Sequence, residues 1–210
     1  MIKKNLKMLI VTSIIILLPI LAGLILWNQL PEQMPIHWNA NGEVDGWSGK
    51  PFTVFGLPVI MLAIQWLCVL GTGADPKKAN HAGKVVRLVF WIIPLLSVVL
   101  HTVTYATALG KEVRMEMVMP VILGLVFTVV GNYLPKCKQN YTIGIKIPWT
   151  LNSEENWNKT HRFAGKLWMV CGIAILFTGF FGGFVIFFGV ALVMVLAPFI
   201  YSYILYKKGI

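Results

Sequence analysis

The sequence predicts an all-α integral membrane protein, a bundle of about six transmembrane helices with both termini in the cytoplasm. Of its 210 residues, 57% are hydrophobic and 12% are charged, whereas roughly 25% are charged in an ordinary soluble domain. The apolar residues gather in stretches of about 20, the length that an α-helix needs to cross a bilayer core about 30 Å thick. Lys and Arg concentrate in alternate connections between these stretches, as the positive-inside rule requires.

Four apolar stretches are each long enough for one transmembrane helix. They cover residues 8–27, 51–70, 88–109 and 117–134. Pro120 falls near the start of the fourth, where a helix tolerates a missing N–H. The first stretch follows a basic start, as a signal peptide does, but it exceeds the usual apolar length of roughly 7–15 residues. We therefore interpret it as a span.

The last apolar region, residues 166–206, has no charge after Lys166 and is too long for one span. Two spans joined by a tight turn at Gly182-Gly183 fit its length, and they bring the total to six. The chain then divides into four parts. These are a first helical hairpin (1–71) with an outer loop (30–50), a second helical hairpin (72–134), a cytoplasmic interfacial segment (135–165) and a C-terminal helical hairpin (166–210).

The distribution of charge predicts the orientation. Fifteen of the eighteen Lys and Arg residues fall on the side of the termini, and Lys50, Lys111 and Arg114 fall on the other. This places both termini in the cytoplasm and the outer loop outside, in a multi-pass arrangement. The same distribution accounts for the net charge of +10, so direct nucleic-acid binding is not expected.

The outer loop is rich in turn formers and in side chains suited to binding. Asn41-Gly42 and Asp45-Gly46 favour tight turns and indicate a compact loop. Its two Trp residues either offer faces to an apolar peptide or form a membrane-interface belt, while its polar residues bind a ligand or only fold the loop. The candidate ligand-binding residues are Pro35, His37, Trp38, Asn39, Gly42, Asp45, Gly46 and Trp47. Their spacing matches no recognised metal-ligand pattern, and no metal or other cofactor is expected.

The cytoplasmic segment carries a second cluster. Ser153 followed by Glu154 and Glu155 indicates a helix start, because the helix dipole favours acids there. Two interpretations stay open: Trp and basic side chains anchor the segment in membrane lipid, or the segment binds a cytoplasmic partner. The candidate partner-binding residues are Pro148, Trp149, Glu154, Trp157, His161 and Arg162.

Two polar side chains, Gln65 and His101, fall inside predicted spans. Such residues usually face a bundle interior and bond to a neighbouring helix, although they can also mark a transport pathway. A small membrane transporter or exporter is therefore the alternative function, against which the spans show no buried carboxylate for a proton relay and no obvious repeat of broken helices. No hydrolase motif occurs on a span, so no catalytic residue is assigned and the chain is not expected to be an enzyme.

Two motifs resemble signatures that occur together in the SdpI-type bacterial immunity proteins. LPEQMPIHWNANGEVDGW, residues 30–47, is similar to the pattern LPxxxPxHWNxxGxxDGW, and IGIKIPWTLNSEENWNKTHRFAGKLW, residues 143–168, resembles the second signature. Ile145 and Lys146 depart from it, since Arg is common there. The resemblance implies a membrane protein, not an enzyme, that protects a bacterium against a secreted peptide toxin met at the outer loop. Some relatives are also linked to signal transduction, in which the membrane protein recruits a cytoplasmic transcriptional repressor.

Overall fold

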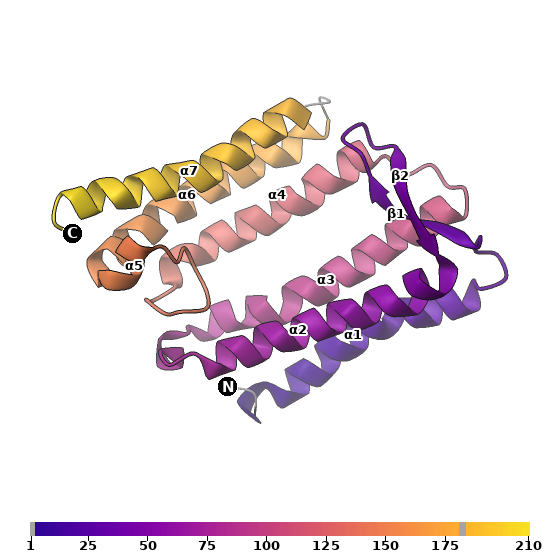
Figure 1. Cartoon of the computed structure of the whole chain (residues 1–210), viewed down its shortest axis with the longest axis horizontal. Coiled ribbons are helices and arrows are strands. Elements are labelled where there is room, and N and C mark those ends of the chain that lie inside the picture. Colours follow the sequence, from indigo (N-terminus) through magenta and orange to yellow (C-terminus); the bar gives the residue numbers. More distant parts are fainter. Residues whose placement is uncertain (1–2, 181–183) are drawn as a thin grey trace. The chain divides into compact units, whose positions relative to one another are not determined.

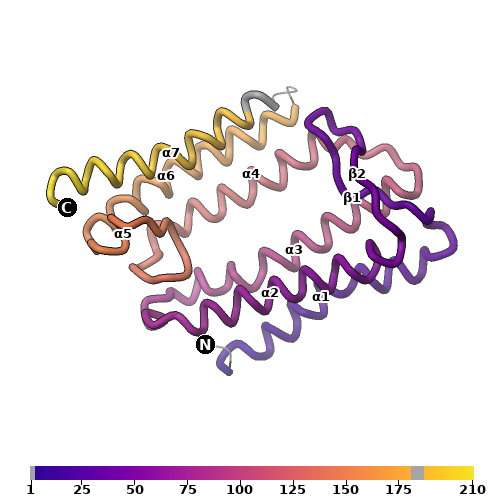
Figure 2. The backbone as a smooth tube through the Cα atoms, viewed as in Figure 1, coloured from indigo at the N-terminus to yellow at the C-terminus, as the bar shows by residue number. Residues whose placement is uncertain are grey.

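Long helices make up most of this computed structural model, which describes residues 3–180 and 184–210 (Figures 1 and 2). A five-residue π-helical turn, Phe52–Gly56, leads into the second long helix. The helices are α1 (Leu6–Ile25), α2 (Leu57–Ala74), α3 (Gly83–Ala108), α4 (Met115–Tyr133), α5 (Pro148–Asn152), α6 (Glu154–Thr178) and α7 (Phe184–Lys207).

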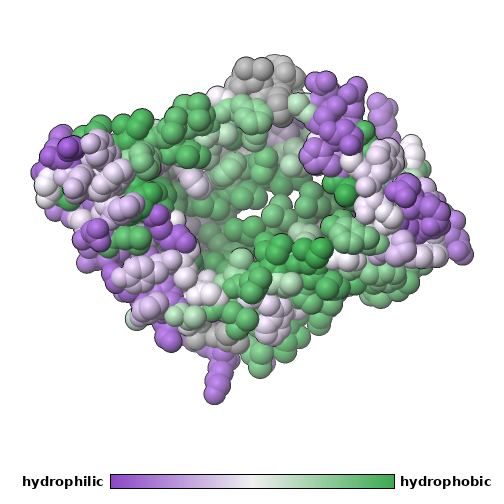
Figure 3. Space-filling view, in the orientation of Figure 1, coloured by the Kyte–Doolittle hydropathy of each residue, from purple (hydrophilic) through white to green (hydrophobic). Residues whose placement is uncertain are grey.

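In the part of the chain that the structure describes, five helical segments are long and apolar enough to cross a membrane. They are Lys3–Ile25, Phe52–Ala74, Gly83–Ala108, Met115–Lys136 and Phe187–Lys207. Figure 3 shows hydrophobic residues over the long helices and hydrophilic residues over the polar connections. Large apolar side chains such as Ile25 and Leu67 are 81% and 68% exposed, as expected of helices that cross a membrane. The chain is therefore a multi-pass membrane protein.

The expected span that is missing from this set is the fifth in chain order, which corresponds to the second half of α6. This helix starts at Glu154 with a polar half that includes Lys159 and Arg162, and becomes apolar only after Lys166. The polar half keeps the helix out of the set of five. The turn expected at Gly182-Gly183 lies outside the described residues.

The chain forms two compact units. Unit 1 comprises Met1–Leu70 and Val89–Met115, and unit 2 comprises Gly71–Leu88 and Glu116–Ile210. The helices α2 and α3 thus each contribute to both units, with the turn between them in unit 2.

Polar side chains in unit 1 bond to backbone carbonyls of neighbouring helices. Ser97 Oγ and Tyr105 Oη of α3 donate to the carbonyls of Ile16 and Pro19 in α1, at 3.0 and 2.9 Å. In lipid no water is available to these groups, so partners within the protein are needed. A Cβ atom on Gly23 would lie 2.8 Å from the Tyr105 hydroxyl oxygen. The absence of a side chain at this position lets α1 and α3 approach.

Residues 33–49 form a β-hairpin, so the protein is mostly helical rather than all-α, and a two-stranded sheet stands where a compact loop was expected. Strand β1 (Gln33–Trp38) pairs antiparallel with β2 (Val44–Gly49), and in Figure 1 the hairpin lies near the ends of α1 and α2. Asn39 Oδ1 accepts hydrogen bonds from the amides of Asn41 and Glu43, and Gly42 has φ +80°. The predicted turn residues therefore connect two strands rather than build a loop alone.

In unit 2, glycines bring α4 and α6 into close contact. Cβ atoms on Gly124 and Gly131 would lie 2.7 and 2.9 Å from the carbonyl oxygens of Gly172 and Gly165. In each helix the two glycines are seven residues apart, so they recur on the same face after two turns. The helices run antiparallel along this line and pack backbone against backbone.

We expect Gly172→Ala to destabilise unit 2, because its Cβ atom would lie 2.6 Å from the Thr128 amide nitrogen. Overpacking of this kind typically costs about 1–3 kcal/mol. Gly189→Ala in α7 is the matched control, since a Cβ atom there has nothing within 4 Å. Unfolding in detergent, followed by Trp fluorescence, measures both. Equal stability of the two variants would contradict close packing of α4 on α6.

Candidate functional site

The hairpin is anchored to the helices of unit 1 by apolar side chains. Leu30 and Met34 are 3% and 0% exposed, and they cluster with Val54 and Tyr105. Pro35 is also buried, directly after Met34. The LPxxxP part of the first motif therefore attaches the hairpin to the helices.

Lys50 completes this anchor with its charge. Its side chain is 7% exposed, and Nζ donates to the Trp27 carbonyl at 3.2 Å and pairs with Glu32 Oε1 at 2.8 Å. The Trp27 ring centroid is 5.1 Å from the same nitrogen. A cation favours a helix C-terminus, where carbonyls lack partners. These buried contacts give Lys50 a structural role.

The second half of the first motif presents polar and aromatic side chains to solvent. His37 Nδ1 and Asp45 Oδ1 are 2.5 Å apart, with the two side chains 70% and 43% exposed. Trp47 is 57% exposed, and Trp38 is half-buried. A Cβ atom on Gly46 would lie 2.6 Å from His37 Cβ, so this glycine makes room for the His37–Asp45 pair.

All eight predicted outer residues thus lie in one hairpin, but they differ in what they contact. Exposed side chains available to a ligand belong to His37, Asp45 and Trp47. Another group shapes the hairpin: Pro35, Asn39, Gly42 and Gly46. The eighth residue, Trp38, is half-buried at the end of β1.

In unit 2, residues 137–147 are held against α6 by Trp157 and His161. Trp157 Nε1 donates to the Cys137 carbonyl at 2.7 Å, and His161 Nε2 accepts from the Ile145 amide at 2.9 Å. The two rings stack with centroids 4.0 Å apart. Gly144, at φ +124°, passes so close that a Cβ atom would lie 2.5 Å from His161 Nε2.

The two bonds of His161 define its protonation. Since Nε2 accepts from an amide, the proton is on Nδ1, which bonds to the Trp157 carbonyl at 2.8 Å. Burial lowers the pKa of His161 to about 4 by disfavouring the charged ring, which outweighs the opposing bond to the Trp157 carbonyl. The imidazole is therefore neutral near pH 7 and serves as a structural acceptor.

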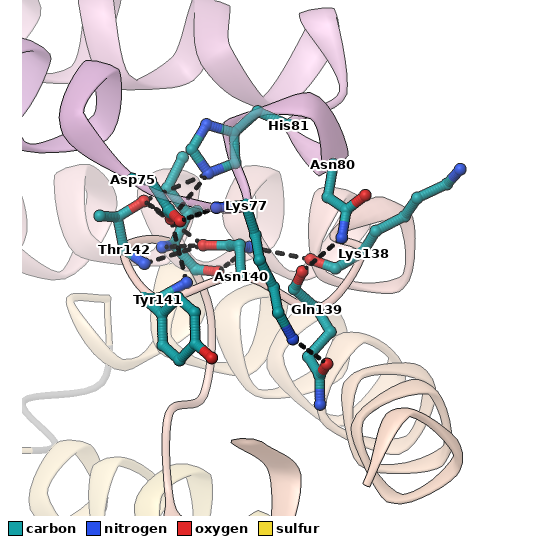
Figure 4. A network of polar contacts seen from close by, with 10 residues as sticks. Asp75, Lys77, Asn80, His81, Lys138, Gln139, Asn140, Tyr141 and Thr142 are labelled. Carbon is teal, nitrogen blue, oxygen red and sulfur yellow. Dashed lines mark hydrogen bonds and ion pairs between the residues drawn. The ribbon is translucent and has the colours of Figure 1, made fainter. Parts of the chain in front are cut away.

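Sequence reasoning missed a second anchor of the same segment, centred on Asp75 (Figure 4). Its fully buried carboxylate accepts bonds from the Lys77 amide (2.7 Å), the Tyr141 amide (3.0 Å) and Thr142 Oγ1 (2.8 Å). His81 Nε2 lies 3.1 Å from it. Burial alone would raise the pKa of Asp75, but these four hydrogen bonds outweigh it and hold the pKa below its ordinary value.

Gln139 extends this contact toward α5. Its side chain accepts from Lys77 Nζ at 2.6 Å and donates to the carbonyls of Thr150 and Leu151, both at 2.9 Å. Asn80 donates to the Gln139 carbonyl at 2.7 Å. The connection between α2 and α3 is thereby tied to residues 139–151.

The predicted partner-binding residues separate into exposed and buried ones. Pro148, Glu154 and Arg162 are exposed. Trp149 is half-buried against Phe199, Tyr203 and Tyr206 of α7. Trp157 and His161, 0% and 1% exposed, lie inside the unit and do not contribute to its surface.

The two intramembrane candidates are buried in unit 1. Gln65 Nε2 donates to the Phe90 carbonyl at 3.0 Å. His101 Nδ1 lies 2.7 Å from the Ser97 carbonyl, and its ring meets Tyr105 edge-on at 5.9 Å. Gln65 thus joins α2 to α3, whereas the contacts of His101 lie within α3 itself.

Together, the long apolar helices, the anchored hairpin and the polar segment on α6 define a multi-pass helical membrane protein with two structured polar regions. Residues 136–202 match the SdpI/YfhL protein family, and residues 14–62 match a domain of unknown function, DUF1648. The chain is 34% identical over 209 residues to the immunity protein SdpI of Bacillus subtilis (strain 168), covering 98% of this chain and 97% of that protein. It belongs to the SdpI/YfhL family, which confirms the resemblance seen in the motifs. No solved structure matches.

We expect acidification to destabilise unit 2 through His161. Its folded pKa of about 4 lies below the ordinary 6.5, so the unfolded chain binds this proton more readily. This contribution to the free energy of unfolding is complete above pH 6.5 and decreases as the pH falls through 4, by up to about 3 kcal/mol. Denaturant unfolding in detergent at pH 7, 6, 5 and 4 measures the slope.

His161→Gln is the matched variant, because an amide can still accept from Ile145 and donate to the Trp157 carbonyl but does not titrate in this range. Its stability should vary less with pH than that of the wild type. Parallel pH profiles for the two proteins would contradict the assignment.

Proposed function

We propose that this protein protects a bacterium against a secreted antimicrobial peptide toxin, acting as a membrane immunity protein and not as an enzyme. The observation that carries the proposal is the 34% identity, over almost the whole of both chains, with a protein named for immunity. Both motifs also fold into ordered polar structures. Neither feature calls for a catalytic centre.

In this proposal the protein crosses the bacterial plasma (inner) membrane six times, with residues 166–206 supplying the last two crossings. Both termini and residues 135–165 face the cytoplasm, and the β1–β2 hairpin faces outward. The support is the excess of Lys and Arg on the side of the termini. Only three basic residues fall on the outer side in this proposal. One of them, Lys50, has a structural reason to be there, because it bonds to the Trp27 carbonyl and to Glu32.

The hairpin is the proposed toxin-binding site. A secreted peptide arrives from outside, and the hairpin offers it an exposed indole beside a carboxylate–imidazole pair, Trp47 with Asp45 and His37. Indoles give large apolar contact with a polar edge, and they dominate many peptide interfaces. The scaffold residues beneath hold these groups in place.

We expect Trp47→Ala and Asp45→Ala to reduce protection when the protein is expressed in toxin-sensitive cells. Loss of an aromatic anchor commonly costs about 2 kcal/mol or more of binding, which is roughly thirtyfold in affinity. The toxin concentration that halves growth measures the effect. Both side chains are exposed, so membrane abundance should stay at the wild-type level.

Trp91→Ala is the matched control, since Trp91 is 45% exposed on α3, outside the hairpin. A cysteine placed at Asn41, in a chain without other cysteines, should react with a membrane-impermeant thiol reagent on intact cells. Unchanged protection by the hairpin variants, at equal abundance, would remove the hairpin from the mechanism. Full toxin sensitivity of cells with wild-type protein in the membrane would overturn the immunity role.

A second part of the proposal is that residues 135–165, on the cytoplasmic side, relay a signal to a cytoplasmic transcriptional repressor. The support is a surface on the start of α6 and on α5 with exposed Glu154, Arg162 and Pro148. Trp157 and His161 act through this surface by fixing residues 137–147, not by contact with the partner.

We expect Arg162→Glu to reduce repressor recruitment at least fivefold while protection is retained, because the charge reversal alters an exposed site without removing a buried contact. The amount of repressor that sediments with membranes after toxin exposure measures recruitment. Lys208→Glu, an exposed reversal beyond α7, is the control. Equal recruitment by both variants would exclude this face as the docking surface.

A further inference from the structure

The hairpin has two outer edges, one along each strand. The register of the strands determines which backbone N–H and C=O groups point outward from each edge. In an antiparallel pair, hydrogen-bonded residue pairs alternate with pairs whose N–H and C=O groups point away from the partner strand. The Lys50 amide donates to the Glu32 carbonyl at 2.9 Å. The register Gln33↔Gly49, Met34↔Ser48 and Pro35↔Trp47 continues from that bond.

Counting along the strands from the bond between Lys50 and Glu32, the next hydrogen-bonded pair is Met34 and Ser48. The amides of Trp47 and Gly49 therefore point outward from β2. The corresponding outward positions of β1 are Gln33 and Pro35.

The two edges are not equivalent as templates for another strand. Pro35 has no N–H, which weakens the outer edge of β1 as a place for pairing. The outer edge of β2 keeps the amides of Trp47 and Gly49 and the carbonyl of Trp47, while the Gly49 carbonyl accepts from Thr53 Oγ1 at 3.2 Å. The β2 edge is the more complete template.

We propose that an extended segment of the toxin peptide binds as a third strand along the outer edge of β2. This inference rests on the proposed function and specifies its mode of binding. Added strands gain affinity from main-chain hydrogen bonds, and specificity from alternate side chains. A two-stranded hairpin is also marginally stable alone, so a third strand would stabilise it.

The charge of the hairpin favours a peptide segment with a cationic side chain. Glu43 and Asp45 are exposed acids at and after the turn, whereas the single basic residue between 30 and 50, Lys50, is buried and paired with Glu32. A cation near Asp45 and an apolar side chain beside Trp47 would complement this edge. A second copy of the chain would bring the same acids together, which is unfavourable.

Hydrogen exchange on the full-length protein in lipid nanodiscs tests the pairing directly, with a synthetic Sdp-type toxin peptide as probe. Strand addition should slow exchange of the Trp47 and Gly49 amides at least about tenfold. The Ser48 amide, already bonded within the hairpin, is the internal control and should slow less than the amides of Trp47 and Gly49. Peptide binding without slower exchange at Trp47 and Gly49 would overturn the inference but leave the proposed function intact.

A matched pair of variants at Gly49 tests the contribution of its N–H. Gly49→Ala keeps the amide and is sterically allowed, since the nearest contact of a Cβ atom is Pro51 at 3.9 Å and φ is not positive. Gly49→Pro removes the donor. We expect the peptide Kd to rise at least tenfold for Gly49→Pro and less than twofold for Gly49→Ala. Equal affinities would overturn the inference, and retained Ser48 protection verifies that the hairpin is folded.

Methylation of the peptide's own backbone nitrogens tests the same point without a protein variant. Affinity should fall at every second residue of the bound segment, because alternate amides of an added strand face β2. A pattern without this period would overturn the inference, as would protection of Trp47 and Gly49 by a second copy without peptide. Absence of any binding by the wild-type protein would instead refute the proposed function.

Discussion

The structure of the 135–165 segment depends on the stacked Trp157 and His161 rings. Residues 137–147 contain little regular secondary structure, and buried backbone groups that lack partners cost free energy. The indole of Trp157 satisfies a carbonyl at one end, and the imidazole of His161 satisfies an amide near the other. Gly144 lets the chain cross the rings closely enough for both bonds to form.

The hairpin provides hydrogen-bond partners for its backbone groups in a different way. Its backbone groups are satisfied by strand pairing, with Asn39 capping the turn and Lys50 closing the open end. Side chains are then not needed to bond the backbone along the strands, and those of Asp45 and Trp47 remain exposed. The first motif therefore leaves Trp47 exposed, whereas the second uses Trp157 as an internal support.

Composition predicted most of the membrane helices, because a lipid environment requires long uncharged stretches. Such stretches can be recognised from the residues within a window of about 20. The start of α6 was also predictable: Ser153 Oγ accepts from the Asn156 amide at 3.1 Å, as its position before two acids indicated. The hairpin was not predicted, since Pro35 and Gly46 interrupt strands of six residues and the turn signals dominate. The Asp75 contacts join residues 66 and 67 positions apart, a separation that local patterns do not reveal.

A local signal for Asp75 did exist, because it is the single acid in residues 71–87, which also contain three Lys and one Arg. An isolated carboxylate there invites the question of which donors surround it. The same reasoning separates the motif residues into two kinds. Gly46, Gly144, Trp157 and His161 are determined by close contacts within the fold, so their replacement alters structure first. Residues such as Trp47 and Arg162 have few internal contacts to explain their identity, and side chains of this second kind are where recognition of a partner is most directly tested.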